Sequence, residues 1–150
     1  MVFLKKAIGI EMRYISSLIL NEVDQSQLFK YNPDLTNVKG WTMGFIYRQY
    51  QKGCEVYQKD IEREFKIGRS TATELLQNLE QNGYLKREVS TMDGRLKRIV
   101  LLEKAIELQK EVIKTLNFVE TKVLDGFSSE ERYLLFEYIE RMKKNLERKD

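Results

Sequence analysis

The stretch from Arg69 to Asn82 carries side chains that are suited to contact a nucleic acid. If it forms a helix, four apolar residues turn inward, namely Ala72, Leu75, Leu76 and Leu79. The outward face then carries hydroxyl, amide and carboxylate groups, namely those of Ser70, Thr73, Glu74, Gln77 and Gln81. Small polar groups of this kind can enter a major groove and bond base edges or phosphates. Arg69 and Thr71 flank this face and suit phosphate contacts.

Glu74 limits which DNA sequences this face could accept. Its carboxylate would be repelled by DNA unless it accepted a hydrogen bond from a cytosine amine. Taken alone, the whole stretch is explained equally well by an ordinary solvated helix with a polar face.

A second candidate is the basic segment over residues 86–98. It contains five basic residues, Lys86, Arg87, Arg95, Lys97 and Arg98, and two acidic ones, Glu88 and Asp93. Its local charge of +3 equals the formal net charge of the whole chain. A basic hairpin beside a DNA-reading helix can follow the phosphate backbone, with an arginine near its tip entering the minor groove. A solvated charged hairpin is the alternative, and it is favoured when this segment is considered without its neighbour.

The composition argues against an enzyme or a metal site. The chain of 150 residues contains no histidine, one cysteine and one proline. A histidine-dependent catalytic triad and a disulfide scaffold within the chain are therefore impossible, and a Cys/His zinc site lacks ligands. The sequence shows no activated nucleophile, no phosphate-binding loop and no carboxylate pair in an evident cleft, so we expect no enzymatic activity and no cofactor.

The two candidates require a helix-turn-helix followed by a hairpin. The apolar spacing predicts a short helix over 58–65 and a second over 69–82, joined by about three residues. Gly83 suits the left-handed position that ends a helix. Two strands follow over 84–89 and 96–101, and Asp93-Gly94 between them favours a hairpin turn.

Long amphipathic helices are predicted on both sides of this unit. The first runs from Leu4 to about Phe29, and a second begins at an N-cap Thr36 and ends near Lys52. After the hairpin, an apolar stripe predicts a helix of about 20 residues that ends at Gly126. Ser128 and Glu131 then form the capping box of a final helix.

A helix-turn-helix followed by a hairpin is the winged-helix arrangement. The apolar stripes of the terminal helices exceed what such a small unit can cover. We therefore expect two copies of the chain to interleave their N- and C-terminal helices. The alternative is that these helices pack on each other within one chain. The longest uncharged run near the N-terminus, residues 14–21, is too short to span a membrane, so a cytoplasmic protein without a membrane segment is expected.

Several runs together resemble the MarR family of bacterial transcription regulators. They are Tyr57 to Thr73, Leu79 to Leu85, Asp93-Gly94-Arg95, Leu35-Thr36 and Phe127 to Glu131. The resemblance implies a mainly α fold with a small β-hairpin wing. It also implies a single domain in which residues 35–102 form the winged-helix DNA-binding region and residues 1–34 and 103–150 the dimerisation region. Asp93 would orient the wing, and Arg95 would reach the minor groove.

Two positions depart from the family pattern. Gly68 stands where a serine or arginine is commoner, which removes a side-chain cap or a phosphate contact. Leu102 replaces the usual threonine before the long helix after the wing, so that helix loses its N-cap.

The resemblance further implies a small phenolic or anionic effector, held where the terminal helices meet the winged region. Tyr14, Trp41 and Phe45 are aromatic candidates for this pocket, although core packing at helical spacing is the favoured explanation. Cys54 lies in the turn after the second helix and not near the N-terminal helix that peroxide-sensing relatives use, which disfavours redox sensing.

Two hypotheses follow for the function. The first is a homodimeric regulator, expected to be a repressor, that binds a pseudo-palindromic DNA operator and is released by its effector. The alternative is a winged-helix protein-interaction module that does not bind DNA, in keeping with the modest net charge and with Glu74.

Overall fold

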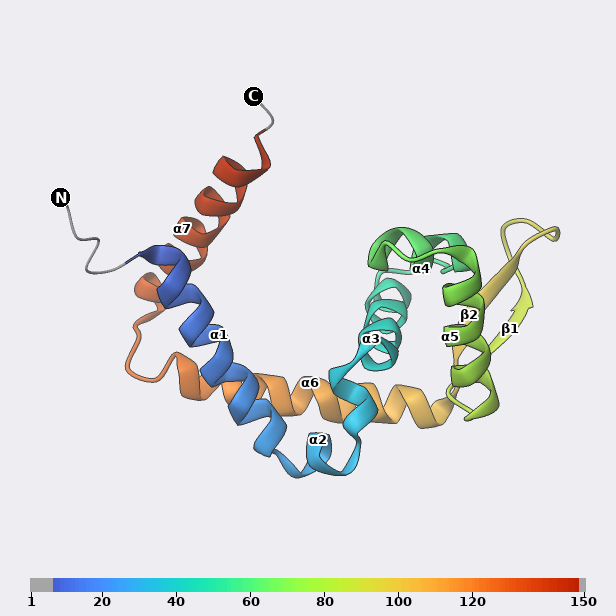
Figure 1. Cartoon of the computed structure of the whole chain (residues 1–150), viewed down its shortest axis with the longest axis horizontal. Helices are drawn as coiled ribbons and strands as arrows, with labels where there is room; N and C mark the ends of the chain where they lie inside the picture. The colour runs from blue at the N-terminus through green and yellow to red at the C-terminus, as the bar shows by residue number, and fades with distance from the viewer. Residues whose placement is uncertain (1–6, 149–150) are drawn as a thin grey trace.

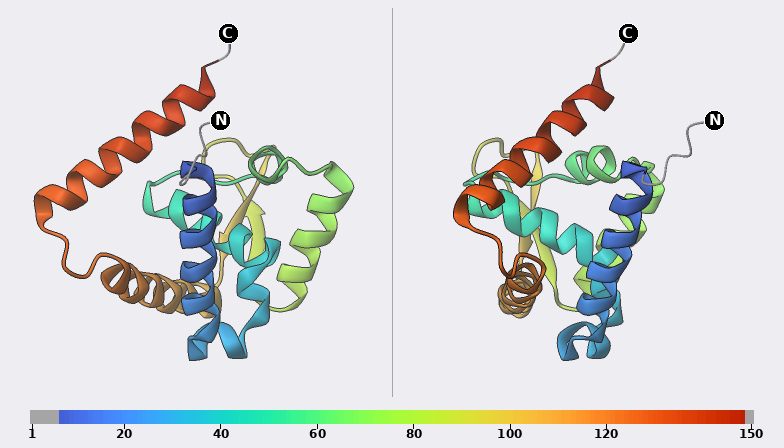
Figure 2. Two further views of the ribbon diagram at one scale, coloured as in Figure 1. Left: turned by 60° about the vertical axis from the view of Figure 1, so that its left-hand side comes forward. Right: turned by 90° about the vertical axis from the view of Figure 1, so that its left-hand side faces the viewer.

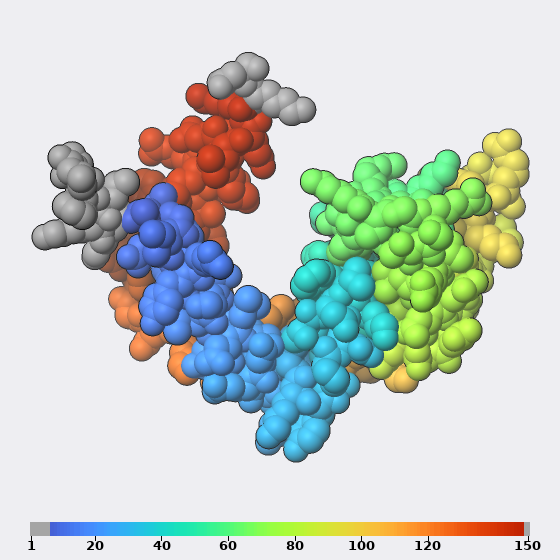
Figure 3. Space-filling view, in the orientation of Figure 1, coloured from blue at the N-terminus to red at the C-terminus, as the bar shows by residue number. Residues whose placement is uncertain are grey.

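Helix α6 (Glu103–Val123) runs beneath two parts of the chain and connects them (Figure 1). The structure is a computed structural model that describes residues 7–148. One part consists of α1 (Ile8–Gln25) and α7 (Ser129–Glu147). The other part consists of α3 (Val38–Gln51), α4 (Gln58–Phe65), α5 (Arg69–Gln81), β1 (Leu85–Val89) and β2 (Lys97–Leu101). Helix α2 (Gln27–Tyr31) and the 3-10 helix η1 (Pro33–Thr36) connect the two, and a hollow separates them (Figure 3). The predicted fold class, mainly α with a small hairpin wing, is confirmed.

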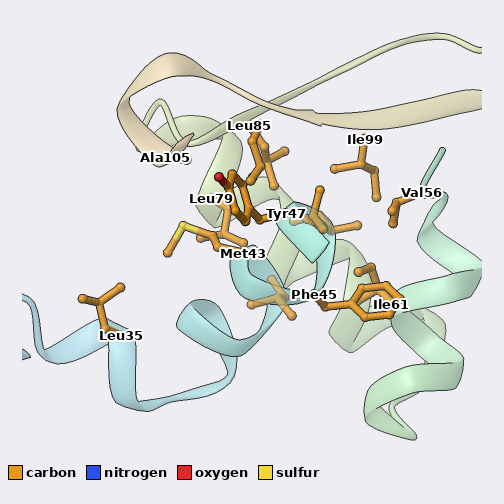
Figure 4. Close-up of a cluster of buried hydrophobic side chains, with 14 of the residues drawn as sticks. Leu35, Met43, Phe45, Tyr47, Val56, Ile61, Leu79, Leu85, Ile99 and Ala105 are labelled. Atoms are coloured by element: carbon orange, nitrogen blue, oxygen red, sulfur yellow. The ribbon is translucent and has the colours of Figure 1, made fainter. Parts of the chain in front are cut away.

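The core lies in the winged part of the chain. The largest of its fully buried side chains come from α3, α4, α5 and β1. Figure 4 shows Met43, Ile61, Leu79 and Leu85 among them, and Ile46 and Leu76 are equally buried. The four residues predicted to face inward from α5 are all buried. Burial of this apolar surface is what fixes the two helices of the helix-turn-helix against α3 and the hairpin.

Gly40 permits the backbone of α3 to lie against η1. A Cβ atom at this position would lie 2.2 Å from the carbonyl oxygen of Leu35, well inside van der Waals contact. Because the obstructing atom belongs to the backbone, no side-chain rotation could relieve the overlap. Leu35 itself is buried, so this contact joins η1 to the core.

The N-terminal region differs from prediction at two points. The first helix does not continue to Phe29, because Ser26 is extended and begins α2 as an N-cap, its hydroxyl accepting from the Phe29 N–H at 3.4 Å. Leu4, where that helix was expected to begin, lies outside the described residues. Thr36 is not the N-cap of α3, because its hydroxyl donates to the carbonyl of Pro33 at 3.0 Å within η1. Asn37 takes the role instead, and its side chain accepts from the backbone N–H of Lys39 at 2.9 Å.

The helix-turn-helix and the hairpin form where they were predicted. Helix α5 ends one residue early, at Gln81, and Gly83 follows with φ +74°. The strands pair antiparallel, with Leu85 opposite Leu101. Asp93 and Gly94 lie in the connection, but they do not form a tight two-residue turn. The connection is a loop over 90–96, closed by the Ser90 N–H donating to the Leu96 carbonyl at 2.9 Å, and Gly94 is not among the glycines with positive φ.

The terminal helices leave much apolar surface uncovered. Helix α1 contacts α6, where the ammonium of Lys122 bonds the carboxylate of Glu22 at 2.7 Å. Helix α7 begins with the predicted capping box of Ser128 and Glu131, yet none of its residues is buried, and it extends away from the rest of the chain (Figure 2). Large apolar side chains remain exposed on both helices, among them Ile8, Ile10, Leu20, Tyr133, Phe136 and Leu146. Within residues 7–148, no helix has the length and apolar character needed to cross a membrane.

Candidate nucleic-acid interface

The interface groove lies between the first turns of α4 and α5 and the wing, which we define as β1, β2 and the 90–96 loop. The groove has a volume of about 830 Å³. Five basic side chains line it, those of Lys59, Arg63, Arg69, Arg87 and Lys97, against two acidic ones, those of Asp60 and Glu62. An excess of positive charge in a concave surface attracts polyanions. The fold therefore gathers the two segments singled out in the sequence around one basic groove.

Helix α5 presents most of its predicted polar face to solvent. The side chains of Ser70, Thr71, Glu74, Gln77 and Gln81 are exposed, as is Arg69. Gly68 stands at the N-cap in an extended conformation and makes no side-chain cap bond, as predicted. The first-turn N–H groups of α5 consequently have no side-chain acceptor from this position, which favours an approaching anion.

The hydroxyl of Thr73 is already hydrogen-bonded within the protein. Its hydroxyl donates to the carbonyl of Arg69 at 2.8 Å and accepts from the side-chain amide of Gln58 at 2.9 Å. The same amide lies 3.3 Å from the Arg69 carbonyl, so Gln58 ties the first turn of α4 to the first turn of α5. Sequence reasoning missed Gln58, because nothing in its local pattern distinguishes it from any polar residue that opens a helix.

Arg95 projects from the wing and is held by Asp93. The carboxylate of Asp93 accepts from the Arg95 backbone N–H at 3.0 Å and from its Nε and Nη2 at 3.2 Å each. The hydrogen bonds from Arg95 lower the pKa of Asp93 below its ordinary value. The Arg95 side chain is nevertheless 91% exposed. Its guanidinium is thus oriented by one neighbour and still free to contact a ligand.

The other basic side chains of the wing differ in their ion pairs and in their exposure to solvent. Glu88 pairs with Lys86 at 3.0 Å and accepts a hydrogen bond from Arg98 Nε at 3.0 Å. These two positively charged side chains lower the pKa of Glu88. Arg87 lies 3.9 Å from Glu80, and its Nε and Nη2 are buried without a hydrogen-bond partner. Lys97 is exposed. Part of the local charge of +3 is therefore engaged within the protein, and its exposed basic residues are Lys86, Arg95 and Lys97.

The segment just before α4 forms the base of the wing. Ile99 of β2 donates its N–H to the carbonyl of Val56 at 2.8 Å, which forms an isolated antiparallel β-bridge beside the hairpin. Beside it, the Glu55 carboxylate accepts hydrogen bonds from Ser90, Thr91 and Tyr57. These bonds lower the pKa of Glu55 from 4.5 to about 2. The sequence pattern did not indicate Glu55, because its partners in the loop lie 35 and 36 positions further along the chain.

The three aromatic residues predicted for an effector pocket lie in different environments. Phe45 is buried in the core and packs edge-to-face against Phe65, with 6.2 Å between ring centroids. Tyr14 on α1 and Trp41 on α3 are 62% and 58% exposed. Core packing accounts for Phe45, while the other two belong to helices on opposite sides of the hollow (Figures 1 and 3). Cys54 is exposed and has a free thiol.

Comparison with known proteins identifies the class to which this fold and groove belong. Residues 34–96 match the MarR family. The MarR transcription regulator of Oenococcus oeni PSU-1 is 30% identical, with 92% of this chain and 99% of that chain covered and a TM-score of 0.63. Staphylococcus aureus MepR in its DNA complex is 27% identical, with 94% and 97% covered and a TM-score of 0.71. MepR bound to ethidium bromide is 26% identical, with 95% and 99% covered and a TM-score of 0.68.

The chain belongs to the MarR family of transcription regulators, as the sequence motifs predicted. The family assignment gives no support to an enzymatic function.

Proposed function

We propose that this protein binds a pseudo-palindromic double-stranded DNA operator as a homodimer and represses transcription until a small-molecule effector releases it. The observation that carries the proposal is the basic interface groove, which Arg69 of α5 and Lys97 of the wing line, together with the exposed Arg95 that projects from the same wing. A helix of this kind fits a major groove, and a projecting arginine fits the adjacent minor groove. The DNA complex of MepR supports the same use of the fold.

The DNA-contacting residues proposed are those singled out in the sequence, with one change of role. Arg69, Ser70, Thr71, Glu74 and Gln77 would face the major groove or its phosphates, and Arg95 and Lys97 would contact the DNA from the wing. Asp93 would act by orienting Arg95. Thr73 would act by fixing α5 to α4, since its hydroxyl already bonds Gln58 and Arg69.

The homodimer is supported by the apolar surface of α1 and α7. A helix such as α7, with exposed tyrosine, phenylalanine and leucine and with no buried residue, requires another surface to cover it. We propose that residues 1–34 and 103–150 supply the dimer contacts and residues 35–102 the DNA contacts. Two recognition helices about 34 Å apart would then meet successive major grooves.

DNA binding is tested by fluorescence anisotropy with operator fragments selected from a random DNA pool. We expect affinity to fall steeply as salt rises, because phosphate contacts release counterions. Arg95→Ala should weaken binding about tenfold and reduce the salt slope. Lys30→Ala, which removes the same charge from an exposed position on α2, should leave the affinity unchanged. If no fragment is retained even at low salt, the protein-interaction module becomes the better description.

Oligomeric state and effector binding are tested separately. Sedimentation should give twice the 17.9 kDa of one chain at micromolar concentration, and a monomer there would contradict the dimer. A hydroxybenzoate, as a phenolic anion, and ethidium, which MepR binds, are the two effector probes. Trp41, the single tryptophan, should report binding by a change in fluorescence, and the same compound should release the DNA. A compound that changes the fluorescence without releasing DNA would contradict its role as effector.

A further inference from the structure

Glu55 lies where the helix-turn-helix, the two strands and the 90–96 loop meet. One carboxylate oxygen accepts from the hydroxyls of Tyr57 and Ser90, at 2.5 Å each. The other accepts from the Thr91 N–H at 2.9 Å and from the Thr91 hydroxyl, and it lies 3.3 Å from Nη1 of Arg98. The side chain is only 12% exposed. A carboxylate bound by five donors in a sheltered position is held rigidly.

A continuous series of hydrogen bonds leads from Glu55 to the tip of the wing. The Ser90 hydroxyl, which donates to Glu55, also accepts from the backbone N–H groups of Met92 at 3.0 Å and Asp93 at 3.1 Å. Asp93 in turn holds the guanidinium of Arg95 through two bonds. The direction in which Arg95 projects is therefore linked to the position of Glu55.

The same segment is tied to the DNA-reading helices. Val56 pairs with Ile99 of β2, and the Tyr57 N–H donates to the Asp60 carboxylate at 2.8 Å, which caps α4. Gln58 then bonds the first turn of α5. Four consecutive residues, 55–58, thus connect the 90–96 loop, β2, α4 and α5. Glu55 is the member of this group that contacts the 90–96 loop by charge-assisted bonds.

We propose that Glu55 is the positioning residue of the wing, which sets the placement of Arg95 relative to α5 and so couples the minor-groove contact to the major-groove contact. This inference rests on the proposed DNA-binding function. Without Glu55, the 90–96 loop keeps only the hydrogen bond of 2.9 Å between the hydroxyls of Tyr57 and Ser90 as its link to the segment before α4. The Thr91 bonds and the Arg98 contact are lost, so Arg95 is held less firmly relative to the recognition helix.

Simple electrostatics and positioning predict opposite results for removal of this charge. Glu88 is the matched control, because it shares the Arg98 partner but bonds only strand residues and not the 90–96 loop. Removing a negative charge from a DNA-binding face should strengthen binding or leave it unchanged, and we expect this for Glu88→Ala. For Glu55→Ala we expect a loss of affinity of about tenfold, close to the loss caused by Arg95→Ala. Glu55→Gln, which keeps the volume of the side chain, serves if the alanine variant does not fold.

Two further measurements decide whether Glu55 acts through the wing. In the Arg95→Ala background, Glu55→Ala should cause no additional loss of affinity, because the contact that it positions is already absent. Trypsin cleavage after Arg95, measured without DNA, should be faster in Glu55→Ala than in the parent and in Glu88→Ala. Equal losses in both backgrounds, or unchanged cleavage, would overturn the proposal. If the parent binds no DNA, the proposed function fails. The cleavage rates would still test whether Glu55 keeps the 90–96 loop in place.

Discussion

Replacement of Gly40 by alanine should destabilise the protein by about 3 kcal/mol, at the upper end of the usual cost of overpacking. The added Cβ would lie 2.2 Å from the carbonyl oxygen of Leu35 and 2.5 Å from its Cα, where ordinary contacts begin at 3.4 Å. Helix α3 and η1 would have to separate by more than an ångström, and the buried Leu35 would move with the backbone. The gain in helix propensity of up to about 1 kcal/mol cannot offset this cost.

The assay is urea denaturation followed by far-ultraviolet circular dichroism at one fixed protomer concentration. We expect the midpoint for Gly40→Ala to fall by about 1.5 M, for a slope near 2 kcal/mol per M. Gly44→Ala is the matched control, one turn further along the same helix. Its Cβ would meet the flexible end of Arg48 at 3.3 Å, so its midpoint should stay the same or rise slightly. Equal midpoints for the parent and both variants would refute the close approach of α3 and η1.

Two other predictions concern charged groups. Because the pKa of Glu55 is lowered from 4.5 to about 2, its carboxylate contributes stability that is present above pH 4.5 and is lost as the pH falls toward 2. Glu55→Gln should therefore flatten the dependence of unfolding free energy on pH in this range. If the unfolding free energy of the variant fell with pH as steeply as that of the parent, the hydrogen bonds of Glu55 would be contradicted. Lys104 donates to the carbonyl of Asn82 at 3.0 Å and lies over the Tyr84 ring at 4.3 Å. Lys104→Met should lower the melting temperature by about 2–4 °C, whereas Lys104→Arg should not, and equal values for both would remove the charge from the explanation.

The elements whose limits depend on neighbouring residues could be predicted from the sequence. Helix α4 has the predicted limits, and α5 ends one residue from its predicted end, because apolar spacing and a following glycine determine them locally. The capping box of Ser128 and Glu131 formed for the same reason. Thr36 shows the limit of such reasoning, since a side chain that can cap a helix can equally close the 3-10 turn before it.

The residues that position the site could not be predicted in the same way. Glu55 and Ser90 bond each other across 35 positions, and neither belongs to a motif with fixed spacing. Gln58 and Thr73 meet only because α4 and α5 cross at a particular angle. Outward-facing residues follow from helical periodicity, whereas the partners that orient them depend on tertiary geometry. Arg95 was predicted from its place near the tip of the hairpin and from the family resemblance, whereas Glu55, whose loop partners lie 35 and 36 positions away, was not.

Helix α6 limits how the chain can change in length. Ala105, near its start, is buried against the winged part, and Val119, near its end, is buried beside α1. One inserted residue between them would turn Val119 and everything beyond it by about 100° relative to the DNA-reading helices. Insertions of three or four residues would nearly restore the orientation and lengthen the helix by about 5 Å. In the proposed homodimer, a change in the spacing of the operator half-sites would therefore have to be matched by a change in α6 of a whole helical turn.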